Sequence, residues 1–200
     1  SDLIIGGRYG DTIEVVDGNN LVMWDRGRVT AAYAGGRRVT ELPMTFGLIE
    51  TIQFNDGGVD AIHTGVGKDI ILGGDEGDTI IANLGETAGN DLQDIVLGDD
   101  GKIDFVAVER GATLGVQGAD TDPSDIDLIE SLSTAVGGAI DPDLGGGADQ
   151  ITTGAVADIV IGGRYGDTIN AGGGSNLVIG DSGRVTAANA TGPQFAGLLM

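Results

Sequence analysis

Residues 64–80 read TGVGKDIILGGDEGDTI, and this stretch holds two copies of a nine-residue pattern. In each copy glycines precede an aspartate, Asp69 or Asp78, and an isoleucine follows two places later. The same spacing separates Asp60 from Asp69 and recurs along residues 149–167. A repeat of odd length cannot keep one side chain facing inward along a continuous strand, so each unit must contain a short strand and a turn.

The apolar position of the pattern indicates strands rather than helices. Every member is isoleucine or valine, and β-branched residues favour strands. The glycines supply positive φ and room for close approach of the backbone. Two strands and two turns then close one coil about every 18 residues. The members of this apolar ladder are Ile4, Ile13, Val22, Ile62, Ile71, Ile80, Val96, Ile151, Val160, Ile169 and Val178.

These residues resemble the RTX (repeat-in-toxin, hemolysin-type) calcium-binding nonapeptide family, whose consensus is GGxGxDxUx. Residues 64–72 fit this consensus nearly throughout, whereas Tyr9, Glu76 and Tyr165 stand where it has glycine. The resemblance covers roughly half of the chain. It implies an all-β fold, a parallel β-roll (β-solenoid) with calcium held between successive turns on the same edge. It also implies a secreted or cell-surface protein that leaves a bacterial cell by a type I route.

The ligand pattern can also be built from coordination chemistry. Calcium takes six to eight hard oxygen ligands, and a glycine-rich turn that closes on an aspartate offers carbonyls and a carboxylate. Turns on one edge pair Asp60 with Asp78, Asp149 with Asp167, and Asp69 with Asp94 across a seven-residue insertion. Asp2 with Asn20 and Asp158 with Asn176 should bind more weakly, because an amide contributes no charge. The predicted metal ligands are the side chains of Asp2, Asp11, Asn20, Asp60, Asp69, Asp78, Asp94, Asp149, Asp158, Asp167 and Asn176, and the backbone carbonyls of Gly6, Gly10, Gly65, Gly67, Gly73, Gly77, Gly162 and Gly166.

A metal-free alternative treats the same Asp and Asn residues as formers of Asx-turns in a β-solenoid. Composition favours calcium: 31 acidic residues against 10 basic give a formal net charge of -21, and stacked carboxylates repel one another without a cation. We therefore expect several calcium ions as the cofactor, and a calcium-free chain that is largely unfolded or loosened.

Composition and motifs also bound the class of protein. The chain has no cysteine, so an extracellular location would call for metal rather than disulfides as the stabilising element. It has no apolar run long enough for a membrane span and no secretory leader at its start, and its acidity makes nucleic acid an unfavourable partner. His63 is the only histidine, and no zinc-protease or nucleophile motif is present, so we expect no enzyme. The expectation is a calcium-stabilised extracellular structural or adhesive repeat module. The alternative is a calcium-binding accessory module of a larger secreted enzyme, toxin or adhesin.

A longer repeat contains the short one, because residues 1–32 realign on residues 157–188 with an offset of 156. After each block the aspartate pattern is lost and alternating stretches predict antiparallel hairpins, residues 28–34 with 37–44 and residues 102–109 with 112–117. The expected organisation is a partial β-roll block at 1–27, a hairpin excursion at 28–56, a middle block at 57–101, a hairpin and acidic excursion at 102–145, a third block at 146–185 and a C-terminal extension at 186–200.

One outward face of the predicted strands is almost entirely apolar and cannot plausibly stay in contact with water. Two readings stay open and are compatible: the hairpins fold back over this face, or other copies of the chain pack against it. The chain begins inside a block and ends without resuming the roll, which fits either a piece of a longer repetitive protein or copies that stack head to tail into a fibre. The face is formed by Leu3, Ile5, Leu21, Met23, Ile70, Leu72, Ile95, Leu97, Ile159, Ile161, Leu177 and Ile179.

Overall fold

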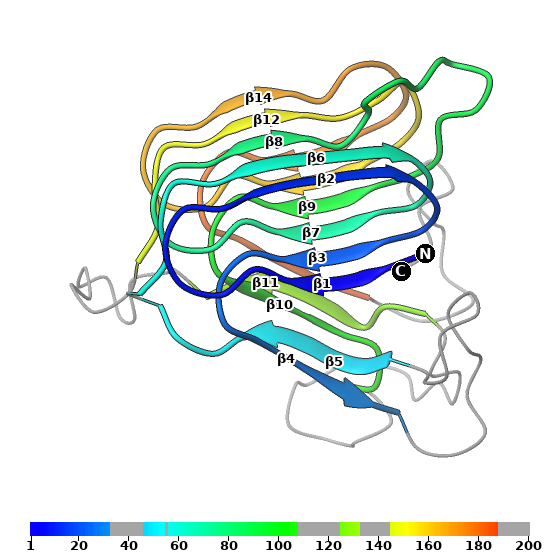
Figure 1. The fold of residues 1–200 in the computed structure, drawn as a ribbon. Coiled ribbons are helices and arrows are strands. Elements are labelled where there is room, and N and C mark those ends of the chain that lie inside the picture. Colours follow the sequence, from blue (N-terminus) through cyan, green and yellow to red (C-terminus); the bar gives the residue numbers. More distant parts are fainter. Residues whose placement is uncertain (33–45, 55, 108–124, 133–144, 188–200) are drawn as a thin grey trace.

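A computed structural model of the chain describes residues 1–32, 46–54, 56–107, 125–132 and 145–187. These residues form sixteen strands in three sheets and contain no helix (Figure 1), so the all-β prediction is confirmed. Within this described part, no segment is a helix long and apolar enough to cross a membrane.

Two of the sheets are parallel, and the chain alternates between them. We call the six-stranded one the central sheet, with the order β1-β3-β7-β9-β13-β15, and the five-stranded one the outer sheet, with the order β2-β6-β8-β12-β14. The central strands are β1 (Leu3–Ile5), β3 (Leu21–Met23), β7 (Ile70–Leu72), β9 (Ile95–Leu97), β13 (Ile159–Ile161) and β15 (Leu177–Ile179). The outer strands are β2 (Thr12–Asp17), β6 (Ala61–Val66), β8 (Thr79–Ile81), β12 (Gln150–Thr152) and β14 (Thr168–Asn170).

The isoleucine and valine ladder fills the space between these two sheets. Its members pair with one another in register, for example Ile71 with Val96 in the central sheet and Ile62 with Ile80 in the outer sheet. All four of these side chains are fully buried in one apolar cluster, together with Trp24. Each such side chain contributes about 1.5–3 kcal/mol by leaving water, so the β-branched position of the repeat explains why the two sheets pack face to face.

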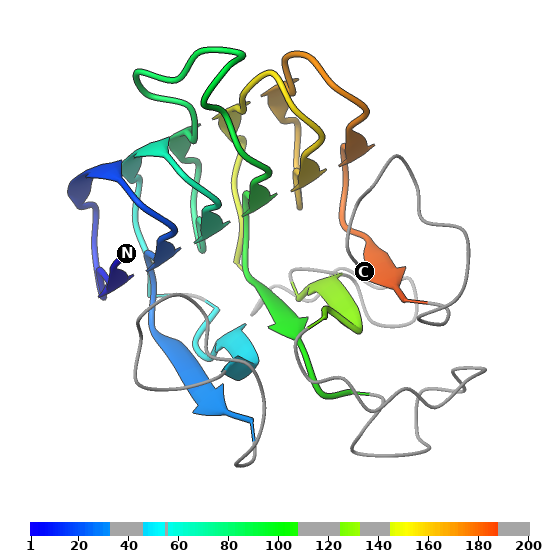
Figure 2. The same cartoon turned by 90° about the vertical axis from the view of Figure 1, so that its right-hand side faces the viewer.

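The third sheet is antiparallel and lies against the opposite face of the central sheet, so the molecule has three layers (Figure 2). Its order is β16-β11-β10-β5-β4, and its strands come from the segments that leave the parallel sheets after β3, β9 and β15. Its strands are β4 (Gly27–Ala31), β5 (Phe46–Thr51), β10 (Gly101–Asp104), β11 (Leu128–Ser131) and β16 (Arg184–Thr186).

This antiparallel sheet covers most of the apolar face that the sequence offered for self-association. Phe46, Ile49, Ile103 and Ile129 pack from it onto the central sheet. Of the twelve residues of the face, Leu3 and Ile5 at β1 stay 40% and 46% exposed. Three others, Ile70, Leu177 and Ile179, are partly buried. The seven buried members cannot contact another copy, and they are Leu21, Met23, Leu72, Ile95, Leu97, Ile159 and Ile161.

The hairpins differ in their partners from those expected. β4 pairs with β5, whose residues follow the segment predicted as the second half of the hairpin, and β10 pairs with β5 and β11. The predicted partner stretches 37–44 and 112–117 lie outside the described residues. Strands from separate excursions therefore pair into one sheet. No local sequence pattern predicts such long-range pairing.

A row of alternating charges crosses the antiparallel sheet. In the strand register Arg28 stands opposite Glu50, Glu50 opposite Lys102, Lys102 opposite Glu130, and Glu130 opposite Arg184. Arg28 forms an ion pair with Glu50, and Lys102 Nζ lies 2.7 Å from Glu130 Oε2. Opposite charges directly across neighbouring strands favour this register over one shifted by a residue.

The residue two places after each central strand decides where the chain goes next. Gly7, Gly74 and Gly163 hold this place after β1, β7 and β13, with φ of 115°, 108° and 119°, and there the chain turns into the outer sheet. Aspartates hold it after β3, β9 and β15, and there the chain enters the antiparallel sheet. Glycine adopts positive φ without steric cost and aspartate does so much less readily, which accounts for the alternation. The aspartates are Asp25, Asp99 and Asp181.

Candidate metal sites along two carboxylate ladders

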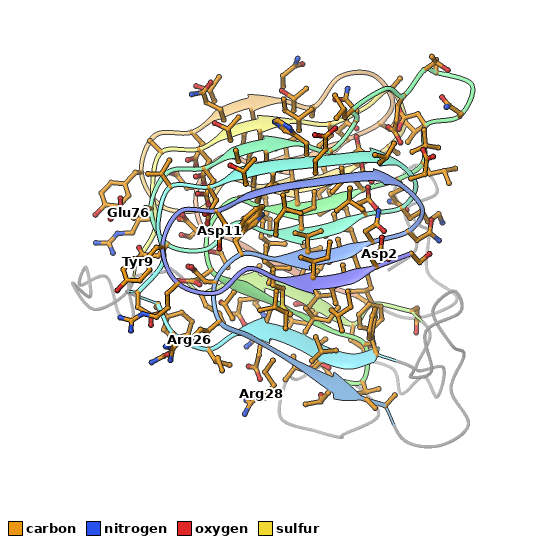
Figure 3. The ribbon with its side chains drawn as sticks, viewed as in Figure 1. Asp2, Tyr9, Asp11, Arg26, Arg28 and Glu76 are labelled. Atoms are coloured by element: carbon orange, nitrogen blue, oxygen red, sulfur yellow. The ribbon has the colours of Figure 1, made fainter. Side chains whose placement is uncertain are left out.

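Five aspartates form the first ladder, each directly before a strand of the outer sheet. The Oδ1 atom of every member after Asp11 accepts the backbone N–H of the preceding member, as Asp78 does from Asp60 at 2.9 Å and Asp149 from Asp78 at 2.8 Å. Figure 3 labels Asp11 at the start of this ladder. Its members in order are Asp11, Asp60, Asp78, Asp149 and Asp167.

Six residues form the second ladder on the opposite edge, each directly before a strand of the central sheet. Asp94 Oδ1 accepts the N–H of Asp69 and Asp158 Oδ1 accepts the N–H of Asp94, both at 2.9 Å. Figure 3 labels Asp2 at the start of this ladder. Its members in order are Asp2, Asn20, Asp69, Asp94, Asp158 and Asn176.

The second carboxylate oxygen of most ladder aspartates is buried and accepts no hydrogen bond. A buried polar atom without a partner costs about 1–3 kcal/mol, and more when it carries charge, so a regular series of them needs a physical explanation. The residues whose Oδ2 atom is in this state are Asp60, Asp69, Asp78, Asp94, Asp149, Asp158 and Asp167. The hydroxyls of Thr64 and Thr153 lie near Asp69 and Asp158 and partly offset the rise in the pKa that burial causes at these two carboxyls.

Burial raises the pKa of these carboxyl groups. It raises the pKa of Asp78 and that of Asp94 to about 9, with further increases from the neighbouring ladder charges. The pKa of Asp149 is raised to about 7 and that of Asp60 to about 6, again mainly by burial. The ladders therefore hold charged side chains in an environment that disfavours the charge, and a bound cation would reverse this preference.

Backbone oxygens approach the same carboxylates at the first ladder. A Cβ atom placed on Gly6 would lie 2.8 Å from the Trp24 carbonyl oxygen and 3.2 Å from Asp11 Oδ2. At Gly73 it would lie 2.7 Å from Asp78 Oδ2 and overlap the Gly98 carbonyl oxygen. Gly162 repeats this arrangement with Asp167 Oδ2 and the Gly180 carbonyl, and Gly98 with Asp149 Oδ2 and the Gly162 carbonyl. A carboxylate and a carbonyl oxygen thus converge on each glycine, and these are the donors that calcium prefers.

The two asparagines behave differently from the aspartates. Asn20 Nδ2 donates to the Gly18 carbonyl at 2.6 Å and to Asp69 Oδ1 at 3.0 Å. Asn176 Nδ2 donates to the carbonyls of Ala171 and Gly173 at 2.6 and 2.7 Å. At these two places the amide itself satisfies the turn carbonyls, so a cation is not required there.

Five of the nine ladder contacts join the residues that the sequence pairs: Asp2 with Asn20, Asp60 with Asp78, Asp69 with Asp94, Asp149 with Asp167, and Asp158 with Asn176. The other four contacts span an excursion and were not foreseen. They join Asp11 to Asp60, Asn20 to Asp69, Asp78 to Asp149, and Asp94 to Asp158.

The predicted carbonyl ligands fall into two groups. Gly6, Gly73 and Gly162 lie where carboxylate and carbonyl oxygens converge. Gly10, Gly65, Gly67 and Gly77 pack closely against the backbone of the neighbouring strand or turn, which explains why these positions have no side chain. That the carbonyls of these four residues and of Gly166 bind metal stays a prediction. Sequence reasoning missed the carbonyls of Trp24, Gly98 and Gly180, although the same dipeptide, Gly98-Asp99 and Gly180-Asp181, follows β9 and β15. The second group is Gly10, Gly65, Gly67, Gly77 and Gly166.

The left-handed backbone of the turns persists where the nonapeptide consensus glycine is replaced. Tyr9, Glu76 and Tyr165 have φ of 69°, 71° and 80°. Arg8 and Arg164 stack on the two tyrosine rings at 5.4 and 5.0 Å. Non-glycine residues pay about 1–2 kcal/mol for this conformation, so the turn geometry is imposed by its surroundings.

Asp25 and Asp99 extend the first ladder outward and were also missed as site residues. Asp25 Oδ2 accepts the N–H of Asp75 at 2.6 Å, and its Oδ1 is buried without a hydrogen-bond partner. Asp99 accepts the N–H of Gly147 at 2.8 Å and that of Arg164. Burial raises their pKa values to about 7 and about 8. Both aspartates therefore tie a departing segment to the turns beside it while adding charge to the same edge.

No family model, curated protein or solved structure matches the chain.

Proposed function

We propose that the chain is a calcium-stabilised structural repeat module, in which the alternating parallel strands form a β-roll and calcium ions lie between its successive coils. The observation that carries this proposal is the series of seven ladder aspartates whose second oxygen is buried without a partner. A metal-free Asx-turn scaffold would leave these oxygens desolvated at a cost repeated in every coil.

The residues present fit calcium at the first ladder. Asp78, Asp149 and Asp167 would each supply one carboxylate oxygen, and the carbonyls of Gly98 and Gly180 would supply neutral ones. A bound calcium ion contributes a fixed double positive charge that offsets the carboxylates and satisfies the carbonyls. Its larger size and flexible coordination suit a mixture of carbonyl and carboxylate ligands better than the octahedral requirement of magnesium.

Mass action makes several such sites decisive for folding. A ligand present at a hundred times its dissociation constant and bound only to the folded state adds about 2.7 kcal/mol per site. With a net charge of -21, the folded chain depends on cations to offset the repulsion among its carboxylates. We propose that the module works where free calcium is in the millimolar range, outside the cell or on its surface, as the RTX resemblance implies.

A structural or adhesive role is the function we propose, in preference to an accessory module of a larger secreted enzyme, toxin or adhesin. The offset of 156 residues carries over to the strands: β1, β3 and β4 correspond to β13, β15 and β16. The large unit is therefore itself a repeat, which is typical of extended structural arrays. No enzymatic role is proposed.

Head-to-tail assembly of separate copies gains only partial support. Extending the central sheet from β15 onto β1 of another copy in the existing register would place the Asn176 N–H beside the Asp2 carboxylate, continuing the second ladder. The same stacking would leave one strand position open between β16 and β4 of the next copy in the antiparallel sheet, because β15 is the last central strand and β3 only the second. We therefore propose a module in a continuous array, and chromatography in millimolar calcium showing a monomer would agree with it.

The test is calorimetric titration with calcium and with magnesium, followed in parallel by circular dichroism. We expect several calcium ions per chain, weak or no magnesium binding, and a gain of β signal on calcium addition. The variant Asp78→Asn keeps the Oδ1 hydrogen bond to Asp60 and removes one charge, so it should bind less calcium; Glu14→Gln, on the solvent-facing side of β2, is the control. An unchanged calcium stoichiometry in Asp78→Asn, or the same β signal with chelator and with calcium, would refute the proposal.

A further inference from the structure

The loop between β8 and β9 carries a carboxylate cluster that does not belong to the nonapeptide pattern. Corresponding connections are shorter, and Figure 2 shows this green loop standing out beyond the neighbouring turns. Glu86, Asp91 and Asp94 each offer one carboxylate oxygen, and the three oxygens lie within 4.8 Å of one another. Only Asp94 is part of a ladder.

Each of the three carboxylates uses one oxygen to hold a neighbouring turn. Glu86 Oε1 accepts the N–H of Gly67 at 3.2 Å, and Asp91 Oδ2 accepts those of Val156, at 3.0 Å, and Ala155. Asp94 Oδ1 accepts the N–H of its ladder neighbour. The cluster is therefore fixed from both sides, by the turn before β7 and by the turn before β13.

The other oxygen of each carboxylate is buried and accepts no hydrogen bond from an N–H or hydroxyl group. These atoms are Glu86 Oε2, Asp91 Oδ1 and Asp94 Oδ2. Asp94 is 0% exposed and Asp91 is 6% exposed, so water does not solvate them. Three acidic groups with three unsatisfied buried oxygens have the donor set of a hard divalent cation and no basic partner among the described residues.

The loop is folded so as to keep this geometry. Asp91 N–H and Asn90 N–H both donate to the Thr87 carbonyl at 3.0 Å, and Leu84 N–H donates to the Thr64 carbonyl at 2.9 Å. The Asn90 side chain accepts from the backbone N–H and the hydroxyl of Thr87 at 2.7 Å. Burial, followed by a hydrogen bond between the Glu86 and Asp91 carboxyl groups, raises the pKa of Glu86 to about 8, as expected for acidic groups held together without a counter-ion.

We propose that Glu86, Asp91 and Asp94 form a calcium site of their own, which fastens the inserted loop to the turns on both sides of it. This site goes beyond the module function proposed above, because two of its three ligands lie in the insertion and it needs no calcium at the first ladder. The ion would join the turn at Gly67, the loop and the turn at Ala155 into one unit.

The test is calcium calorimetry on the wild type, Glu86→Gln and the control Glu14→Gln. We expect Glu86→Gln to bind one calcium ion fewer than the wild type and Glu14→Gln to bind the same number. Circular dichroism in saturating calcium separates this loss from misfolding: Glu86→Gln should keep the wild-type β signal, because Glu86 belongs to neither ladder.

The outcomes separate the two proposals. If the wild type binds one calcium ion and Glu86→Gln binds none, this site is supported and the ladder proposal is contradicted. Several bound ions with the same number in Glu86→Gln would overturn this site and leave the ladder proposal standing. A wild type that binds no calcium would overturn both.

Discussion

Acidification should fold the calcium-free protein, the reverse of ordinary acid denaturation. Eight described carboxyl groups have a pKa raised to between about 6 and about 9, in each case mainly by burial. A folded-state pKa above that of the unfolded chain means that the folded chain binds more protons, so the free energy of unfolding falls as the pH rises. The eight groups are Asp25, Asp60, Asp78, Glu86, Asp94, Asp99, Asp100 and Asp149.

The magnitude is large enough to decide whether the protein folds. Between about pH 4.5 and 6 each group is protonated in the folded chain and ionised in the unfolded chain, which lowers the free energy of unfolding by about 1.4 kcal/mol per pH unit. Eight groups together give on the order of 10 kcal/mol per pH unit. Whole domains are stable by only about 5–15 kcal/mol, so the transition should fall within about one pH unit.

The assay is circular dichroism with urea denaturation in chelator from pH 4 to 8. We expect β structure near pH 4.5 and its loss by about pH 7. With calcium the slope should reverse, because protons then compete with the ion for the carboxylates. A high concentration of potassium chloride controls for general repulsion, since it screens surface charge but not burial. Chelated protein with the same denaturation midpoint at pH 4.5 and 7 would contradict this reasoning.

Three further predictions concern the scaffold. Ile71→Ala, between the parallel sheets, should lower the free energy of unfolding in calcium by about 2–5 kcal/mol, measured by urea denaturation. Ile81→Ala, at a partly exposed position, should lower it much less, and equal losses would contradict the assignment of Ile71 to the core. Lys102→Glu places a third acidic residue between Glu50 and Glu130 and should lower the free energy of unfolding by about 1 kcal/mol. High salt should reduce this loss, and a loss that does not depend on salt would contradict a stabilising role of the charge row. Glu76→Gly relieves a φ of 71° and should raise the thermal midpoint, with a gain of up to about 1 kcal/mol, while Glu14→Gly in a strand should lower it; a lower midpoint for Glu76→Gly would mean that the side chain supports the turn.

The nine-residue period predicted the contacts that depend on local geometry and no others. It placed Ile62 and Ile71 between two sheets and set Asp60 beside Asp78, because both follow from strand and turn lengths within one coil. It could not set Asp78 beside Asp149, because the sequence does not state that the chain returns to the same register after residues 102–145.

The antiparallel sheet shows the same limit. The stretch at residues 48–52 carries a β-branched and apolar pattern, but its partners β4 and β10 lie in separate excursions. Asp25 and Asp99 were not predicted as site residues, because the nine-residue aspartate pattern does not include them. The role of Asp25 and Asp99 depends on turns that are distant in sequence. Asp25 accepts a hydrogen bond from the N–H of Asp75, and Asp99 accepts one from the N–H of Gly147.

The two parallel sheets continue in unbroken register through both departures, from β3 to β6 and from β9 to β12, although the departures differ in length. The stack thus accepts departures of different length, although Phe105 and Ile126, between β10 and β11, pack into the core beneath the antiparallel sheet. Changes of length in the excursions should therefore be tolerated as long as the pairing of β4, β5, β10 and β11 and the packing of Phe105 and Ile126 are kept.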